Sequence, residues 1–314
     1  MDWPWTGRGL AVAPGSAYHG PMPELPDITI YQDALRERLR DALVREIVVV
    51  TPFVLRSVTP PLSEFVNVPV LGVERVGKRV VLACAGERFL VIHLMIAGRL
   101  QWAPLGKKPV ARAAMARFEF STGSLVLTEA GTTRRASLTA VVGRDALRAM
   151  DRGGLDVFAS TDAALITRLR SENHTLKRAL TDPRLLDGIG NAYSDEILHA
   201  ARLSPLLLTQ RMSDEAAGQL IAAIRSTLTM WTNRLRDELH GDWPVKVTAF
   251  RPEMAVHGRF GAPCPVCDAP VQRIRYAQNE TNYCARCQTG GRLLADRAMS
   301  RLLKSDWPRS LDDL

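Results

Sequence analysis

The sequence lacks long hydrophobic runs, and it has too few cysteines for a disulfide scaffold. No apolar stretch approaches the roughly 20 residues that a bilayer-spanning helix needs, and residues 1–21 contain no continuous apolar core of a signal peptide. Five cysteines in 314 residues do not form the dense framework of a small secreted domain. These absences exclude a membrane-anchored chain and a disulfide-stapled one, and we expect a soluble intracellular protein.

The composition is that of a folded protein with a basic surface. Hydrophobic residues make up 46% and charged residues 24% of the chain, which excludes global disorder and low-complexity classes. Lysine and arginine number 41 against 33 acidic residues, giving a net charge of +8. Such a balance favours a polyanionic partner, either nucleic acid or an anionic membrane surface. The length is typical of two domains.

The first half of the sequence predicts one helix followed by a β-rich region. Residues 1–21 are rich in proline and glycine and are predicted to be an unstructured leader. Apolar residues at helical spacing predict a helix over Asp27–Val44, with Pro26 in its first turn. Short β-branched or alternating runs follow, and their close spacing favours a sandwich or barrel. The predicted strands are Ile47–Val50, Val68–Val73, Val80–Ala85, Phe89–Leu94, Arg117–Phe120 and Ser124–Thr128.

The pattern becomes helical after Gly153–Gly154. The predicted helical segments are Ala163–Ser171, Leu176–Leu180, Ala192–Ala201 and Asp214–Leu239. A segment punctuated by proline and glycine then leads to four cysteines and to a last amphipathic stretch, Leu293–Leu303. The sequence therefore predicts an α+β chain, with the strands gathered before the helices.

The strongest local signal is a quartet of cysteines. Cys264 and Cys267 form one C-x2-C pair, and sixteen residues later Cys284 and Cys287 form another. Two such pairs supply four thiolates to one tetrahedral zinc ion, and a closed site of this kind is structural. Four unrelated buried thiols and an iron–sulfur cluster are the less favoured interpretations. Cys84 lies in an apolar β-rich run and is interpreted as an inert core thiol.

An ordered set of motifs carries a family resemblance. The motifs are Met22–Asp27 (MPELPD), Arg75–Val80 (RVGKRV), His93–Leu100 (HLMIAGRL), Leu186–Leu198 (LDGIGNAYSDEIL), Ala201–Pro205 (ARLSP) and the cysteine quartet ending at Gln288. Together they resemble the formamidopyrimidine-DNA glycosylase and endonuclease VIII family. The resemblance covers Met22 to about Gln288, or 267 of 314 residues.

The resemblance implies a fold and a domain order. A leading helix and a β-sandwich would form the catalytic domain over residues 23–150, after a leader of residues 1–22 that is absent from the mature protein. A helix–two-turn–helix domain would span 151–250, a zinc finger 251–290 and a C-terminal extension 291–314. The implied cofactor is one structural Zn²⁺. We expect a monomer that acts on double-stranded DNA containing damaged bases or abasic sites, in the cytoplasm or, in a bacterium, at the nucleoid.

The implied reaction needs a free amine at Pro23. By resemblance, this nitrogen attacks the sugar C1′, forms a Schiff base and supports β-elimination after excision of a damaged, oxidised base. Within a chain the nitrogen of proline is an amide without a lone pair for attack. We therefore expect translation to start at Met22, with methionine removed afterwards, or the leader to be cleaved.

Two further catalytic residues follow from the same resemblance. Glu24 would be the general acid or base, and Lys78, in a turn between two strands, would contact phosphate and assist strand cleavage. Taken alone, Glu24 is better interpreted as a first-turn charge on a helix, and Lys78 as a solvated turn residue. Beside the other motifs, the catalytic interpretation is favoured.

The predicted DNA contacts are Arg135, Lys177, Asn191 and Asn279. Asn191 follows a glycine-rich turn that opens a helix, where backbone approaches phosphate closely. Lys177 is as readily a solvated helical lysine.

Two positions depart from the family pattern. An aromatic wedge next to an arginine is absent from Thr132–Ser137, so Met95 or Ile96 replaces it or the enzyme prefers DNA that is already distorted. Asn279 stands where the family usually has arginine, which removes a bidentate phosphate contact. The alternatives are therefore a non-catalytic, zinc-stabilised damaged-DNA-binding protein and, less favoured, an RNA-binding zinc protein. The sequence does not specify the excised base, nor whether elimination stops after one step.

Overall fold

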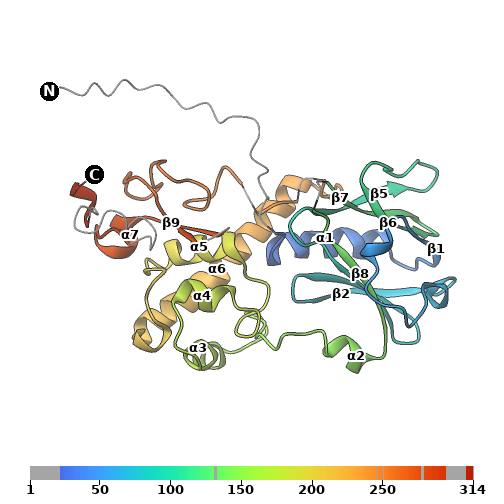
Figure 1. Cartoon of the computed structure of the whole chain (residues 1–314), viewed down its shortest axis with the longest axis horizontal. Coiled ribbons are helices and arrows are strands. Elements are labelled where there is room, and N and C mark those ends of the chain that lie inside the picture. The colour runs from blue at the N-terminus through green and yellow to red at the C-terminus, as the bar shows by residue number, and fades with distance from the viewer. Residues whose placement is uncertain are drawn as a thin grey trace, which may run out of the picture.

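The computed structural model describes residues 22–313 except 131–132, 246, 250, 277–278 and 295–308. The predicted leader and most of the predicted amphipathic stretch Leu293–Leu303 lie outside the described residues. Within them, a β-sandwich, a helical domain and a cysteine-bearing hairpin follow in the predicted α+β order (Figure 1). No helix among the described residues is long and apolar enough to cross a membrane.

Helix α1 (Leu25–Arg38) opens the fold and is shorter than predicted. Pro26 occupies its first turn, and the Asp27 carboxylate accepts the backbone N–H of Glu24 at 2.9 Å, which secures the helix start. The predicted continuation to Val44 is wrong, because Asp41 takes a left-handed backbone with φ of 58° and Val44 begins a strand. The apolar residues after the helix therefore face the same core from a strand.

Two four-stranded antiparallel sheets form the sandwich. One has the order β1-β6-β7-β5 and the other β2-β3-β4-β8. Their inner faces enclose a core that includes Phe118, Leu82 and Leu90, and helix α1 contributes Tyr31 and Leu35 to it. The strands are β1 (Val44–Val49), β2 (Val70–Val76), β3 (Arg79–Cys84), β4 (Arg88–His93), β5 (Gly98–Pro104), β6 (Ala114–Phe120), β7 (Gly123–Glu129) and β8 (Ser137–Val142).

The helical domain and the hairpin complete the chain. Thr161, Thr175 and Ser213 cap three of the helices with side-chain oxygens. The helices are α2 (Arg144–Arg148), α3 (Asp162–Arg170), α4 (Leu176–Thr181), α5 (Asn191–Ala200), α6 (Asp214–Leu239) and α7 (Ala285–Thr289). The hairpin consists of β9 (Gln272–Tyr276) and β10 (Asn279–Tyr283), and short 3-10 turns occupy Pro52–Val54, Leu62–Phe65, Thr209–Arg211 and Leu311–Asp313.

The two domains meet along α1 and the C-terminal half of α6 (Figure 1). Leu235 of α6 is part of the sandwich core. Trp243, just beyond α6, packs against Tyr31 and Trp102 with ring centroids 5.8 and 6.1 Å apart. Its indole N–H donates to the carbonyl of Leu100 at 3.0 Å. The end of the long helix is therefore anchored in the other domain, which places the start of α1 beside the helical domain.

Candidate active site

The carboxylate of Glu24 lies between the domains and caps helix α5. Glu24 is 1% exposed. Its oxygens accept the backbone N–H groups of Gly190 at 2.6 Å, Ala192 at 2.9 Å and Tyr193 at 3.3 Å. The first N–H groups of a helix have no partner within the helix and form the positive end of its dipole. A carboxylate from one domain is thus bound by the helix start of the other.

Lys78 converges on the same point from the turn between β2 and β3. A Cβ added at Gly190 would lie 2.5 Å from the Glu24 carboxylate carbon and closer still to the Lys78 ammonium. A side chain at this position would therefore displace one or both of these groups. Burial lowers the pKa of Lys78, while the negative charges of Glu24 and Asp187 oppose that shift. The structure brings Glu24 and Lys78 together at Gly190.

Pro23 is buried immediately before α1. Its neighbour Glu24 fixes the direction in which the chain enters the helix, because both the backbone N–H and the carboxylate of Glu24 are bound. Pro23 therefore directly precedes, in the chain, the residue whose carboxylate meets Lys78. With Met22 attached, its nitrogen is an amide.

Basic residues lie around His93. His93 pairs across the β3–β4 ladder with Arg79. Burial, together with the positive charges of Arg79, Lys78 and Arg152, lowers the pKa of His93 to about 4. A neutral imidazole among cations suits contact with an anion. Sequence reasoning assigned no role to His93, because its pairing with Arg79 depends on the register between β3 and β4.

Asp27 is a second buried carboxyl that sequence reasoning missed. It is fully buried, and its Oδ1 has no hydrogen-bond partner. Desolvation raises the pKa of Asp27 to about 7, and the nearby charge of Glu24 raises it as well. The signal in the sequence was its place three residues after Glu24, which is the spacing of a capping box.

Arg135 lies on the surface at the end of a loop that the structure describes only from Thr133 onward. The buried carboxylate of Glu129 accepts the backbone N–H of Arg135 at 2.7 Å and of Ala136 at 2.8 Å. This contact fixes the backbone and leaves the Arg135 side chain exposed.

The other predicted DNA contacts belong to three neighbouring elements. Lys177 lies on α4, Asn191 begins α5 and Asn279 begins β10. The Asn191 amide donates to the carbonyl of Glu280 at 2.9 Å, which joins α5 to the hairpin. The Lys177 ammonium is bound within the protein, to the carbonyl of Asn191, the hydroxyl of Ser194 and the carboxylate of Asp195.

The four cysteines form the predicted metal centre. Their sulfur atoms all lie within 4.8 Å of one another, with separations of 3.4 Å for Cys267–Cys284 and 3.9 Å for Cys264–Cys287. Zn–S bonds of about 2.3 Å in a tetrahedron place sulfurs roughly 3.8 Å apart. The donor set therefore fits one structural zinc. His199 of α5 lies 3.3 Å from the Cys264 sulfur and ties the site to the helical domain.

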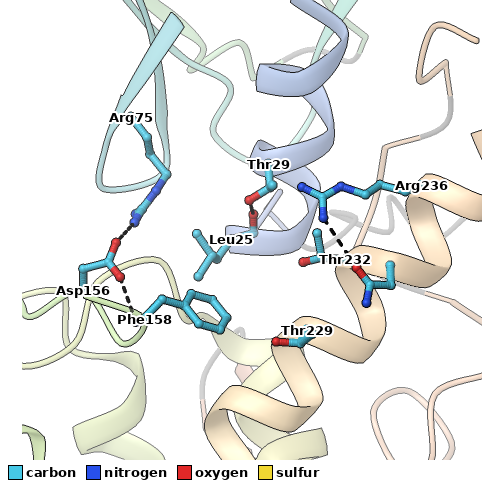
Figure 2. A pocket seen from close by; sticks show the side chains of 9 residues that line it. Leu25, Thr29, Arg75, Asp156, Phe158, Thr229, Thr232 and Arg236 are labelled. Atoms are coloured by element: carbon cyan, nitrogen blue, oxygen red, sulfur yellow. Dashed lines mark hydrogen bonds and ion pairs between the residues drawn. The ribbon is translucent and has the colours of Figure 1, made fainter. Parts of the chain in front are cut away.

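A pocket of about 360 Å³ opens between the domains on the side of α1 lined by Leu25 and Thr29. Figure 2 shows Arg75 of β2 paired with Asp156 on one side of it, and Arg236 of α6 on the other side. Arg75 pairs with Asp156 at 2.6 Å and also with Asp187. These ion pairs join the Lys78 turn to the loop that leads into α5.

Family comparisons agree with this architecture. The formamidopyrimidine-DNA glycosylase N-terminal domain matches residues 22–137, the H2TH domain of the same enzyme matches 156–234, and the zinc finger found in FPG and IleRS matches 261–290. The formamidopyrimidine-DNA glycosylase of Thermus thermophilus is 31% identical over 283 residues, which is 86% of this chain and all of the relative. The chain belongs to the formamidopyrimidine-DNA glycosylase family.

Other members show how far the likeness extends. An uncharacterized formamidopyrimidine-DNA glycosylase-like protein of Mycobacterium tuberculosis is 39% identical over 157 residues, covering 50% of this chain and 96% of the relative. The crystal structure of the T. thermophilus protein has a TM-score of 0.71 at 28% identity, over 85% of this chain and 98% of that one. The Lactococcus lactis enzyme, in a complex with DNA containing FAPY-dG, has a TM-score of 0.75 at 21% identity, over 85% and 100%.

Proposed function

We propose that this protein excises damaged, oxidised bases from duplex DNA and then cleaves the abasic site through a Schiff base on Pro23. The observation that carries the proposal is the meeting of Glu24, the residue after Pro23, with Lys78 at Gly190. The names of the relatives and the FAPY-dG complex of the L. lactis enzyme support it. A basic protein with net charge +8 is suited to a polyanion.

The first step is displacement of the base. The lone pair of a free Pro23 nitrogen attacks C1′, and the bond from C1′ to the base breaks with its electron pair going to the base. The proton that the nitrogen loses passes to Glu24, which delivers a proton to the departing base or to the ring oxygen, and water protonates the other. The bond from C1′ to the ring oxygen then opens with its electron pair going to that oxygen, and an iminium ion remains. The chemistry requires a secondary amine, so the active form begins at Pro23.

The second step is elimination. Removal of a proton from C2′ pushes electrons toward C3′, and the bond from C3′ to the phosphate oxygen breaks, which releases the 5′-phosphorylated strand. Lys78, with His93 and Arg79 nearby, would stabilise the developing phosphate charge. Arg135, Asn191 and Asn279 would hold the flanking backbone and the hairpin against the duplex.

Borohydride trapping on abasic DNA tests the proposal. We expect protein beginning at Pro23 to form a covalent adduct, and the 314-residue form with Met1 retained to form none. Glu24→Gln should slow base excision more than trapping on a preformed abasic site. Equal trapping by the two forms, with Met1 confirmed by mass spectrometry, would show that Pro23 is not the nucleophile.

A non-catalytic damaged-DNA-binding protein is the second candidate. The absence of an aromatic wedge in Thr132–Ser137 and the asparagine at position 279 favour it. Tight binding of an abasic duplex without any adduct from the form that begins at Pro23 would select this function. The retained Glu24 and Lys78 pair favours the enzyme.

A further inference from the structure

The ammonium group of Lys177 is bound within the protein, unlike that of a lysine that is free to contact a phosphate. An ammonium has three N–H donors, and Lys177 directs them to the carbonyl of Asn191 at 2.6 Å, the hydroxyl of Ser194 at 2.8 Å and the carboxylate of Asp195 at 2.6 Å. Its side chain is only 12% exposed. Each donor is therefore used by the helix that follows.

The partner of Lys177 is a fully buried carboxylate. Asp195 is 0% exposed. Its second oxygen accepts the Nδ1–H of His257 at 2.8 Å and the backbone N–H of Asn282 at 3.1 Å. If Lys177 turned toward DNA, Asp195 would lose its counter-ion in the protein interior, and an uncompensated buried charge is strongly destabilising. A direct phosphate contact by Lys177 is therefore disfavoured.

The Asp195 carboxylate, on α5, also links two neighbouring elements, helix α4 and strand β10. Lys177 comes from α4, Asp195 from α5, and Asn282 from β10 of the zinc hairpin. The next residue, Glu196, accepts three backbone N–H groups, from Ala255, Val256 and His257, at 2.7 to 3.0 Å. One turn before Asp195, the Asn191 amide reaches the carbonyl of Glu280. Helix α5 thus holds the hairpin along one face.

We propose that Lys177 and Asp195 are positioning residues. Their buried ion pair fixes α5 and its Asn191 against the zinc hairpin, and Lys177 makes no contact with a DNA phosphate. This inference rests on the proposed DNA-binding function and replaces a direct role for Lys177 with an indirect one.

The salt dependence of binding separates the two roles. The zinc-loaded protein is titrated with a duplex that carries a tetrahydrofuran abasic-site analogue, and Kd is measured by fluorescence anisotropy across a range of KCl concentrations. For Lys177→Met we expect Kd to rise about tenfold at each concentration, with an unchanged slope of log K against log salt. A slope smaller by about 0.9 would mean that one phosphate contact is lost, and it would overturn the proposal.

A second substitution tests the pairing itself. In Lys177→Met with Asp195→Asn, no unpaired charge remains, and the asparagine oxygen still accepts from Asn282, so we expect most of the affinity to return. A double variant as weak as Lys177→Met alone would contradict the proposal.

Arg178→Met is the matched control. Arg178 is the next residue on α4, its side chain is exposed, and its loss changes the net charge equally. Adding Asp195→Asn to Arg178→Met should not improve DNA affinity. That result would exclude the explanation that removal of any negative charge strengthens binding. If the wild-type protein does not bind the duplex at all, the proposed function fails. If the wild-type protein binds and only the salt slopes of the variants differ from those expected, the proposed positioning role fails and the proposed function is not affected.

Discussion

Asp27 shows how burial changes the charge of a single side chain next to the proposed catalytic group. Its pKa rises from 3.8 to about 7 because desolvation disfavours the carboxylate. The folded protein therefore binds a proton that the unfolded chain has released, at pH values between these two. Stability from this group is fully present below pH 3.8 and is lost as the pH rises through about 7.

Asp27→Asn should remove that pH dependence. Asparagine resembles the protonated acid and can still accept the N–H of Glu24. Between pH 5 and pH 8, we expect the stability of the variant to increase relative to wild type by on the order of 2 kcal/mol. Urea unfolding at several pH values measures it. Parallel curves for the two proteins would mean that Asp27 stays ionised in the fold.

Among single residues, the sequence identified those that belong to motifs with a fixed spacing along the chain. The cysteine quartet and Glu24 both belong to short local patterns. Asp195 was missed because its partners, Lys177, His257 and Asn282, lie on other segments of the chain. The capping-box spacing of Asp27 was visible in the sequence, but the burial that raises its pKa was not. Lys177 illustrates the same limit, since its position on a helix gave no sign of three acceptors on α5.

The start of helix α5 is the element on which the candidate site depends. Gly190 has an extended backbone with φ of −133°, so alanine is compatible with its conformation. The added methyl group would nevertheless overlap Glu24 and Lys78. Alanine at position 190 is therefore expected to shift the Glu24 and Lys78 side chains and to leave the backbone conformation unchanged.

Gly190→Ala should reduce borohydride trapping by about 100-fold, because displacement of reacting groups by roughly 1 Å costs that much. Gly218→Ala is the matched control, since nothing lies within 4 Å of its Cβ position on α6. That variant should trap normally and be slightly more stable, because alanine is the better helix former. Equal trapping by both variants would show that Gly190 tolerates a side chain.

Element prediction succeeded where periodicity was strong and local. Helix α6 was predicted at its observed bounds, Asp214–Leu239, because its apolar residues recur at three- and four-residue spacing over a long stretch. Strands β5 and β8 were not predicted individually. Each lies at the edge of its sheet, and pairing with β7 or β4 is what makes it a strand. Helix α1 was predicted too long because the core-facing pattern continues into β1.

At the scale of the whole molecule, zinc should stabilise one end of the chain and leave the rest intact. The hairpin has a small apolar core of its own, formed by Val256, Val271, Ala269 and the buried cysteines. Trp102, Trp231 and Trp243 belong to or pack against the two larger cores instead. Metal binding therefore supplies much of the folding free energy of the hairpin.

Removal of zinc by a chelator should abolish DNA binding while tryptophan fluorescence changes little. Cys264→Ser should behave in the same way without chelator. Cys84→Ala is the control, because Cys84 lies in the sandwich core away from the quartet. If the tryptophan fluorescence were lost together with the metal, the two larger domains would not fold independently of the hairpin.

The contact between Glu24 and α5 holds together two domains that a single cut in the chain would separate into two fragments. The carboxylate and its three donors come from different domains, joined by a connection that runs from α2 to α3. That connection acts as a tether, which keeps each half at a high effective concentration for the other. Cutting it after Gly153 would leave all residues of the site present. Activity would then depend on protein concentration, as in an enzyme assembled from two fragments.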